Sequence, residues 1–284
     1  MNFKKVGIIL KHNQPKAVEI GIDLAKWLIN RGKEVLFTEG IGKALNKNYY
    51  DKKTITSNSD IVIVVGGDGT FLSVARLVKD YSIPIIGINL GGLGFLTEIT
   101  LDEMYDVLDD IFKGNFTINE RMMLKASIYR SGEKISSYSV LNDVVINKGT
   151  LARIIELKTS INDNFVTKYR ADGLIVATPT GSTAYSLAAG GPIIYPELNC
   201  IILTPICPHT LTNRPIVVSG DDIITVELNS LDNDVMITLD GQVGFSLRDE
   251  DIVKIEKDEK KTLILTSPRK NYFETLRTKL KWGL

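Results

Sequence analysis

Apolar and polar residues follow two rhythms along the first third of the chain. Between residues 17 and 29 apolar residues repeat at helical spacing, and Gly32 is typical of a helix end. Thr100 and Glu103 have the spacing of a capping box, for a helix that ends near Gly114. Short apolar runs predict four buried strands, at 6–10, 35–37, 61–65 and 85–88. This alternation predicts a parallel, Rossmann-like sheet in an α/β domain.

The pattern changes after about residue 115. Short segments with alternating apolar and polar residues predict a β-rich, sandwich-like domain, with strands at 124–130, 139–146, 153–159, 165–170, 174–178, 223–228, 235–239, 252–255 and 262–265. Helical spacing returns at Phe273, Leu276 and Leu280. We therefore expect an α/β domain at 1–116, a β-rich domain at 117–266, and a tail at 267–284 that packs back on the first domain.

Composition narrows the functional classes. The chain has 284 residues, and its 34 basic and 34 acidic residues give no net charge, which does not favour nucleic acid as a partner. Its apolar runs are too short for a membrane span or a secretory signal, so no membrane association is expected. Two cysteines, Cys200 and Cys207, do not make a disulfide framework, and we expect a cytoplasmic protein.

A glycine-rich run, Gly66-Gly67-Asp68-Gly69-Thr70, lies between a predicted buried strand and a helix-like segment. Backbone N–H groups at such a helix start, together with the helix dipole, suit a phosphate. Glycine allows close approach to a ligand and positive φ. Asp68 repels phosphate, which indicates a second task such as holding a hydroxyl group or a metal-bound phosphate. The alternative is a tight turn in which Asp68 caps the helix.

Two further segments have residues suited to a nucleotide. Residues 171–192 place hydroxyl side chains and Tyr185 between glycines, although a turn and a capped helix would use the same residue types. Asn142 offers a donor and an acceptor to an adenine edge, and Asp143 accepts from hydroxyl or amine groups. A turn before a strand is the alternative for this pair. The chain contains neither a P-loop nor a G-x-G-x-x-G fingerprint.

In this order, the three segments resemble the motifs of the NAD kinase family. Flanking segments are similar to that family as well, at 89–99, 120–124, 204–217 and 240–242. The resemblance implies that ATP, or another nucleoside triphosphate or polyphosphate, phosphorylates the 2′-hydroxyl of the adenosine ribose of NAD and gives NADP. It also implies a divalent metal, with Mg²⁺ expected, and Asp68 as general base.

The resemblance assigns NAD contacts residue by residue. These are Asp68, Gly69, Asn142, Asp143, Arg153, Arg170, Asp172, Thr183, Ala184, Tyr185, Ser186, Leu187, Ala188 and Gln242. Phe95 packs either on the ligand or in the core. Asp172 matches an acid that reaches the ligand of a neighbouring subunit, so a homo-oligomer, dimer or tetramer, is expected. Asp143 stands where many relatives have Glu, and Ala188 where relatives often have Ser.

Two other functions remain open from the sequence. A lipid or sphingoid kinase shares the glycine-rich run at 66–70, but residues 171–192 are too polar for a lipid cavity. A non-catalytic NAD-binding regulator would dispense with Asp68, which is present. A thermal shift with NAD or NADP, but not with diacylglycerol, would distinguish these possibilities.

Overall fold

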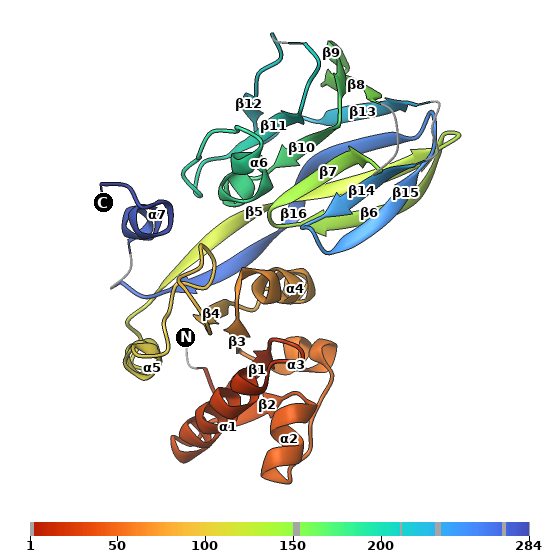
Figure 1. Ribbon diagram of the computed structural model, residues 1–284. Helices are drawn as coiled ribbons and strands as arrows, with labels where there is room; N and C mark the ends of the chain where they lie inside the picture. The colour runs from red at the N-terminus through yellow and green to blue at the C-terminus, as the bar shows by residue number, and fades with distance from the viewer. Residues whose placement is uncertain (1–2, 150–153, 211, 231–233, 269–270, 284) are drawn as a thin grey trace. The chain divides into compact units, whose positions relative to one another are not determined.

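A computed structural model describes residues 3–149, 154–210, 212–230, 234–268 and 271–283 (Figure 1). Contacts divide the chain into two compact units. Unit 1 consists of Met1–Glu120 with Thr262–Leu284, and unit 2 of Arg121–Lys261. Two long strands, β5 (Thr117–Arg130) and β16 (Ile252–Thr266), contribute residues to both units.

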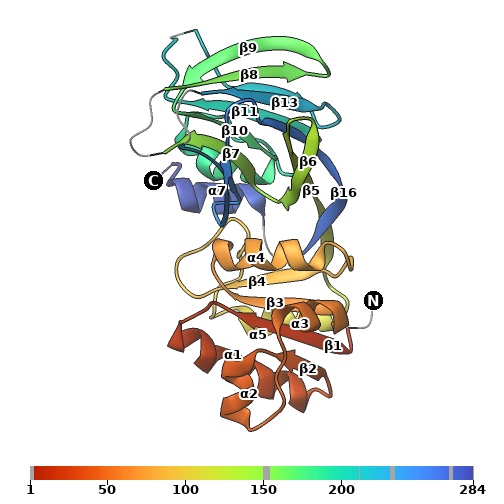
Figure 2. The ribbon, with the colours of Figure 1, turned by 90° about the vertical axis from the view of Figure 1, so that its right-hand side faces the viewer.

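Unit 1 is built on a parallel sheet, as the alternating pattern predicted. Its strands run in the order β2-β1-β3-β4, which Figure 2 shows edge to edge, and Ile264 of β16 pairs with Ile85. The strands are β1 (Lys5–Leu10), β2 (Glu34–Phe37), β3 (Ile61–Gly66) and β4 (Ile85–Asn89). All six residues of β3 are buried, which is expected of a parallel strand with helices on both faces.

Helices supply both faces of this sheet. They are α1 (Pro15–Asn30), α2 (Glu39–Leu45), α3 (Lys52–Asn58), α4 (Asp68–Val78) and α5 (Met104–Phe112). The tail of the chain forms a further helix, α7 (Tyr272–Leu280). Buried residues of α1 and α5 form one apolar cluster with alternate residues of β1 and β3. On the opposite face α3 lies so close that a Cβ at Gly7 would be 2.6 Å from Ile55. Within the described residues, no helix is long and apolar enough to cross a membrane.

Unit 2 is a sandwich of two sheets, which confirms the predicted β-rich class. One sheet has the order β12-β11-β10-β7-β14-β15. In the other, β16 pairs with β13 and β5, β13 with β8, β8 with β9, and β5 with β6. The remaining strands are β6 (Glu133–Val140), β7 (Asp143–Lys148), β8 (Ile155–Ile161), β9 (Asn164–Ala171), β10 (Gly173–Ala177), β11 (Cys200–Ile206), β12 (Ile216–Ser219), β13 (Ile224–Asn229), β14 (Val235–Leu239) and β15 (Val243–Leu247). Alternate apolar residues of both sheets make its core.

The opposite face of the β7–β10–β11 sheet carries a second, smaller apolar cluster. Val145, Ile175, Ala177 and Ile202 of the strands pack there against Ala189 and Ile194. The segment that covers this face contains a 3₁₀ turn, η1 (Thr180–Thr183), and a single helical turn, α6 (Tyr185–Ala188). The two turns do not join into one helix, because the backbone at Ala184 leaves the helical region at φ −95° and ψ −130°.

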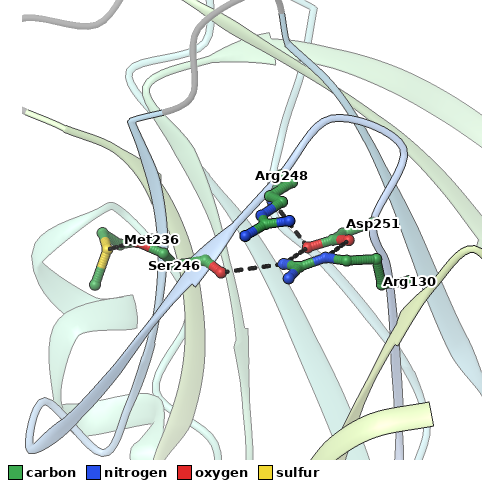
Figure 3. A network of polar contacts seen from close by, with 5 residues as sticks. All are labelled: Arg130, Met236, Ser246, Arg248 and Asp251. Carbon is green, nitrogen blue, oxygen red and sulfur yellow. Dashed lines mark hydrogen bonds and ion pairs between the residues drawn. The ribbon is translucent and has the colours of Figure 1, made fainter. Parts of the chain in front are cut away.

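A partly buried ion pair connects Arg130, at the end of β5, with Asp251, the residue before β16 (Figure 3). Asp251 is fully buried, and the Arg130 guanidinium donates to both of its carboxylate oxygens, at 2.8 and 2.7 Å. The backbone N–H of Arg248 donates to the same carboxylate at 2.8 Å. Such forked pairing compensates a charge that would otherwise be costly to bury.

Several strand and helix boundaries differ from the sequence prediction. The strand expected at 139–146 is two strands, β6 and β7, interrupted at Leu141 and Asn142. The segments expected at 252–255 and 262–265 form one strand, β16, because both of its ends have a pairing partner. Glu103 accepts from the Thr100 N–H at 2.9 Å as in a capping box, but α5 begins only at Met104.

Candidate functional site

Unit 1 has a pocket of about 340 Å³ at the carboxyl ends of β1, β3 and β4. Strand order reverses between β1 and β3, since β2 lies on one side and β4 on the other. Ligands of parallel α/β sheets bind at such a switch point. We call the cavity at this switch point the glycine-rich pocket. The residues that line it are Lys11, Gln14, Gly66, Gly67, Asp68, Asn89, Leu90, Gly91, Gly92, Gly94 and Lys279.

The glycine-rich turn connects β3 to α4 and places the first residue of α4 at this pocket. Asp68 is the first residue of the helix and Gly67 its N-cap, without a side-chain capping bond. The alternative in which Asp68 caps the helix is therefore wrong. Gly66 is required by close packing, because a Cβ there would lie 2.6 Å from the Thr70 hydroxyl. Positive φ is not used at Gly66, Gly67 or Gly69, contrary to expectation, since α4 starts directly from extended backbone.

The Asp68 carboxylate is held by the loop after β4. It accepts hydrogen bonds from the N–H groups of Phe95, Leu96 and Thr97 at 2.9 to 3.1 Å, and from the Thr97 hydroxyl at 2.9 Å. The Phe95 ring is half-buried, with the Lys279 ammonium 5.7 Å from its centroid. Phe95 thus helps to hold the Asp68 carboxylate through its backbone N–H group.

Unit 2 has its own pocket, of about 360 Å³, on the sheet face next to the 180–188 segment. We call it the unit 2 pocket; it is lined by Asn142, Asp143, Val145, Asn147, Ala184, Tyr185, Thr238, Asp240 and Gly241. The structure therefore brings together four of the residues expected to contact NAD: Asn142, Asp143, Ala184 and Tyr185.

Asp240 shapes this pocket, and the sequence analysis did not single it out as a site residue. Its carboxylate accepts from the N–H groups of Leu141, Asn142 and Asp143 at 3.1, 2.7 and 3.3 Å. These bonds explain why the predicted strand at 139–146 is interrupted. Asp240 and Gly241 have φ of 50° and 63°, the geometry of a hairpin turn between β14 and β15. An Asp-Gly pair between two alternating strands was the available signal.

Asp143 is buried next to this second carboxylate, being only 4% exposed. Burial, and then the negative charge of Asp240, raise the pKa of Asp143 to about 7. Near neutral pH the side chain can thus accept or donate a hydrogen bond. The Asn142 Oδ1 atom is buried without a hydrogen-bond partner among the described residues. The turn therefore presents a carboxyl group and an amide, the groups that read the edge of a base.

The segment from Thr178 to Ala188 is anchored to the same turn. The Thr178 hydroxyl donates to the Leu141 carbonyl at 2.6 Å and accepts from the Gly181 N–H at 3.0 Å. A Cβ at Gly181 would lie 2.1 Å from the Asn142 carbonyl oxygen, so only glycine fits there. Ser186 is buried and bonds to the Thr204 hydroxyl, whereas Tyr185 and Ala188 are exposed, and Thr183 and Leu187 are half-buried.

Of the remaining expected contacts, those that the structure describes do not line either of these two pockets. Arg170 is exposed at the end of β9, and Asp172 forms an ion pair with Lys148 at 2.9 Å. Gln242 is exposed in the turn after β14, and Arg153 lies outside the described residues. Across the described ranges, no cluster of three or more His, Cys, Asp or Glu side chains could hold a metal ion.

Family models match most of the chain. The ATP-NAD kinase N-terminal domain matches residues 6–116, and the ATP-NAD kinase C-terminal domain matches residues 141–267. The NAD kinase of Geotalea daltonii is 54% identical over 282 residues, which is 99% of each chain. The NAD kinase of Geobacter sulfurreducens is 51% identical, again over 99% of each chain.

Solved structures share the fold. Yeast NADH kinase complexed with NADH has a TM-score of 0.91 and 23% identity, covering 100% of this chain and 89% of that one. An NAD kinase from Archaeoglobus fulgidus in complex with ATP has a TM-score of 0.77 and 25% identity, covering 98% of each chain. At 23% identity, the likeness to yeast NADH kinase supports a shared fold and nothing further.

Proposed function

This chain belongs to the NAD kinase family, and we therefore propose that it transfers the terminal phosphoryl group of ATP to NAD, giving NADP. The acceptor is the 2′-hydroxyl of the adenosine ribose. The observation that carries the proposal is the glycine-rich pocket, where the start of an eleven-residue helix, two lysines and one carboxylate line the same cavity. The helix start and the lysines suit phosphate oxygens, and the carboxylate suits a hydroxyl proton.

In this proposal Asp68 is the general base. The ribose oxygen attacks the terminal phosphorus as the bond to the leaving diphosphate breaks, and the hydroxyl proton passes to the Asp68 carboxylate. Phosphoryl transfer requires mainly positioning and charge neutralisation. Lys11 and Lys279, which line the pocket, would supply positive charge to the donor phosphates.

The unit 2 pocket is proposed to bind the adenosine part of NAD. Asn142 would pair with the base edge, while Asp143 accepts from a hydroxyl or an amine. The other proposed NAD contacts are Gly69, Arg153, Arg170, Asp172, Thr183, Ala184, Tyr185, Ser186, Leu187, Ala188 and Gln242, with Phe95 as a further candidate. Buried Ser186 would act through its backbone or by supporting Thr204, because its hydroxyl is already bonded.

A divalent cation, Mg²⁺ by preference, is proposed to accompany the phosphate donor. Mg²⁺ commonly keeps several waters and takes one or two carboxylates plus substrate phosphates. In this proposal the donor phosphates and water would hold the cation, because Asp68, the one carboxylate that lines the glycine-rich pocket, is the base, and the described residues contain no cluster of three or more His, Cys, Asp or Glu side chains. The cation would neutralise charge on the donor phosphates.

We further propose a cytoplasmic homo-oligomer, a dimer or tetramer, in which Asp172 contacts NAD bound to a neighbouring subunit. Asp172 is 37% exposed, and it would exchange its Lys148 ion pair for a ligand contact. Two free cysteines, one of them exposed, are consistent with a reducing compartment.

The test is NADP formation from NAD, Mg²⁺ and ATP, read by an NADP-specific dehydrogenase. Parallel reactions replace ATP with polyphosphate or omit the donor. We expect NADP with ATP and none without a donor. A folded protein that produces no NADP with either donor would overturn the proposal.

Asp68→Asn tests the base. The amide keeps the size of the side chain but no longer takes a proton, so turnover should fall by roughly 100-fold or more while NAD still raises the melting temperature. Turnover within a few-fold of the wild type would remove Asp68 from this role.

A further inference from the structure

The loop at residues 94–97 encloses the carboxylate of Asp68 on one side. The Oδ1 atom accepts from Leu96 N–H at 3.1 Å, Thr97 N–H at 3.0 Å and the Thr97 hydroxyl at 2.9 Å. Within the described residues Oδ2 accepts only from the Phe95 N–H, at 2.9 Å. Each carboxylate oxygen has about two lone pairs. Oδ1 is therefore saturated, and Oδ2 keeps the capacity to accept one more proton donor.

This arrangement is built into the loop. A Cβ at Gly94 would lie 2.2 Å from the Asp68 Oδ1 atom, and a Cβ at Gly87 would lie 2.7 Å from the Thr97 side chain. Thr97 is itself fully buried. The glycines thus let the loop close on the carboxylate, and the Thr97 hydroxyl is the one side-chain donor that Asp68 receives from the described residues.

Asn89 fixes the direction of the Thr97 hydroxyl. Its Oδ1 accepts from the Gly91 N–H at 2.8 Å, which assigns the amide orientation and turns Nδ2 toward Thr97. Nδ2 then donates to the Thr97 hydroxyl oxygen at 2.7 Å. Because an amide nitrogen can only donate, the single hydroxyl proton of Thr97 is left for Asp68.

We propose that Thr97, oriented by Asn89, is a positioning residue for phosphoryl transfer. Its hydroxyl holds Oδ1 of Asp68, so that Oδ2 is the oxygen that takes the proton of the ribose hydroxyl. Thr97 acts through Asp68 and does not touch the reacting atoms. The inference rests on the proposed function, because it refines the task given to Asp68 there.

The test compares Thr97→Val, which keeps the shape but loses the hydroxyl, with Thr97→Ser, which keeps the hydroxyl. Loss of one charge-assisted hydrogen bond should lower kcat about 10- to 100-fold in Thr97→Val. Its KM for NAD should stay within about two-fold, since the hydroxyl meets Asp68 and no substrate. Thr97→Ser should keep kcat within about three-fold. Equal kcat in the two variants, or a loss confined to KM, would overturn the proposal.

Two controls separate positioning from general structural damage. Thr100→Val removes a hydroxyl that contacts the Glu103 carboxylate, at 3.1 Å, and should leave kcat unchanged. In an Asp68→Asn background, Thr97→Val should lower the residual rate less than about two-fold, because both changes act on one step. A full further loss in that background would contradict action through Asp68. Thr97→Ala provides a second hydroxyl-free variant if Thr97→Val unfolds.

NADP formation by the wild-type protein separates a failure of the proposed kinase activity from a failure of the role of Thr97. If it makes no NADP, the proposed function fails, and the role of Thr97 falls with it. If it makes NADP but Thr97→Val and Thr97→Ser turn over alike, only the positioning role fails.

Discussion

Asp143 provides a pH-dependent test of the unit 2 pocket. It is 4% exposed, and burial and the charge of Asp240 raise its pKa from 3.8 to about 7. Asp143→Asn keeps the shape of the side chain and removes the titration. We expect the wild type, but not this variant, to lose stability as the pH rises through the neutral range.

The sign and size follow from proton linkage. Above the ordinary pKa of Asp the unfolded chain releases the proton, while the folded chain retains it until the pH approaches about 7. The folded state thus binds more protons in this window, and the free energy of unfolding falls as the pH rises. At ~1.4 kcal/mol per pH unit, the loss between about pH 5.5 and about pH 8 is roughly 2 kcal/mol.

The assay is urea unfolding followed by circular dichroism at both pH values. We expect the free energy of unfolding of Asp143→Asn, relative to that of the wild type, to rise by roughly 2 kcal/mol from the lower to the higher pH. Asp163→Asn, in the exposed turn between β8 and β9, is the matched control and should follow the wild type. A difference between Asp143→Asn and the wild type that is independent of pH would refute the reasoning.

Three further predictions concern stability and binding. Asp251→Ala removes a fully buried carboxylate that accepts three hydrogen bonds and should cost about 1–3 kcal/mol in urea unfolding; a cost below about 0.5 kcal/mol would contradict a stabilising role of this carboxylate. Gly181→Ala places a Cβ 2.1 Å from a backbone oxygen and should cost about 1–3 kcal/mol, whereas Gly92→Ala, with nothing within 4 Å, should be tolerated. Asp172→Ala should weaken NAD binding about ten-fold in calorimetry, with Glu227→Ala as the ion-pair control; unchanged affinity would remove that contact.

The sequence by itself determined the class of both units. Five consecutive apolar residues before the glycine-rich turn are enough to specify a buried parallel strand, and alternation in the second half is enough to specify a half-buried one. The motifs at 66–70, 142–143 and 171–192 identified the family, because their chemistry is local in the chain. Hydrophobic period and turn residues act over a few positions, so a single sequence reveals them.

Only the tertiary structure decided how the site residues are held. The interruption at Leu141 and Asn142 depends on the carboxylate of Asp240, which is almost 100 residues away in the chain. The hold of Thr97 on Asp68 depends on two strands lying side by side in the sheet. The raised pKa of Asp143 likewise depends on burial and on Asp240. Hydrogen bonds and charges between distant segments leave no periodic signal, because any residue of the right chemistry can supply them once the chain has folded.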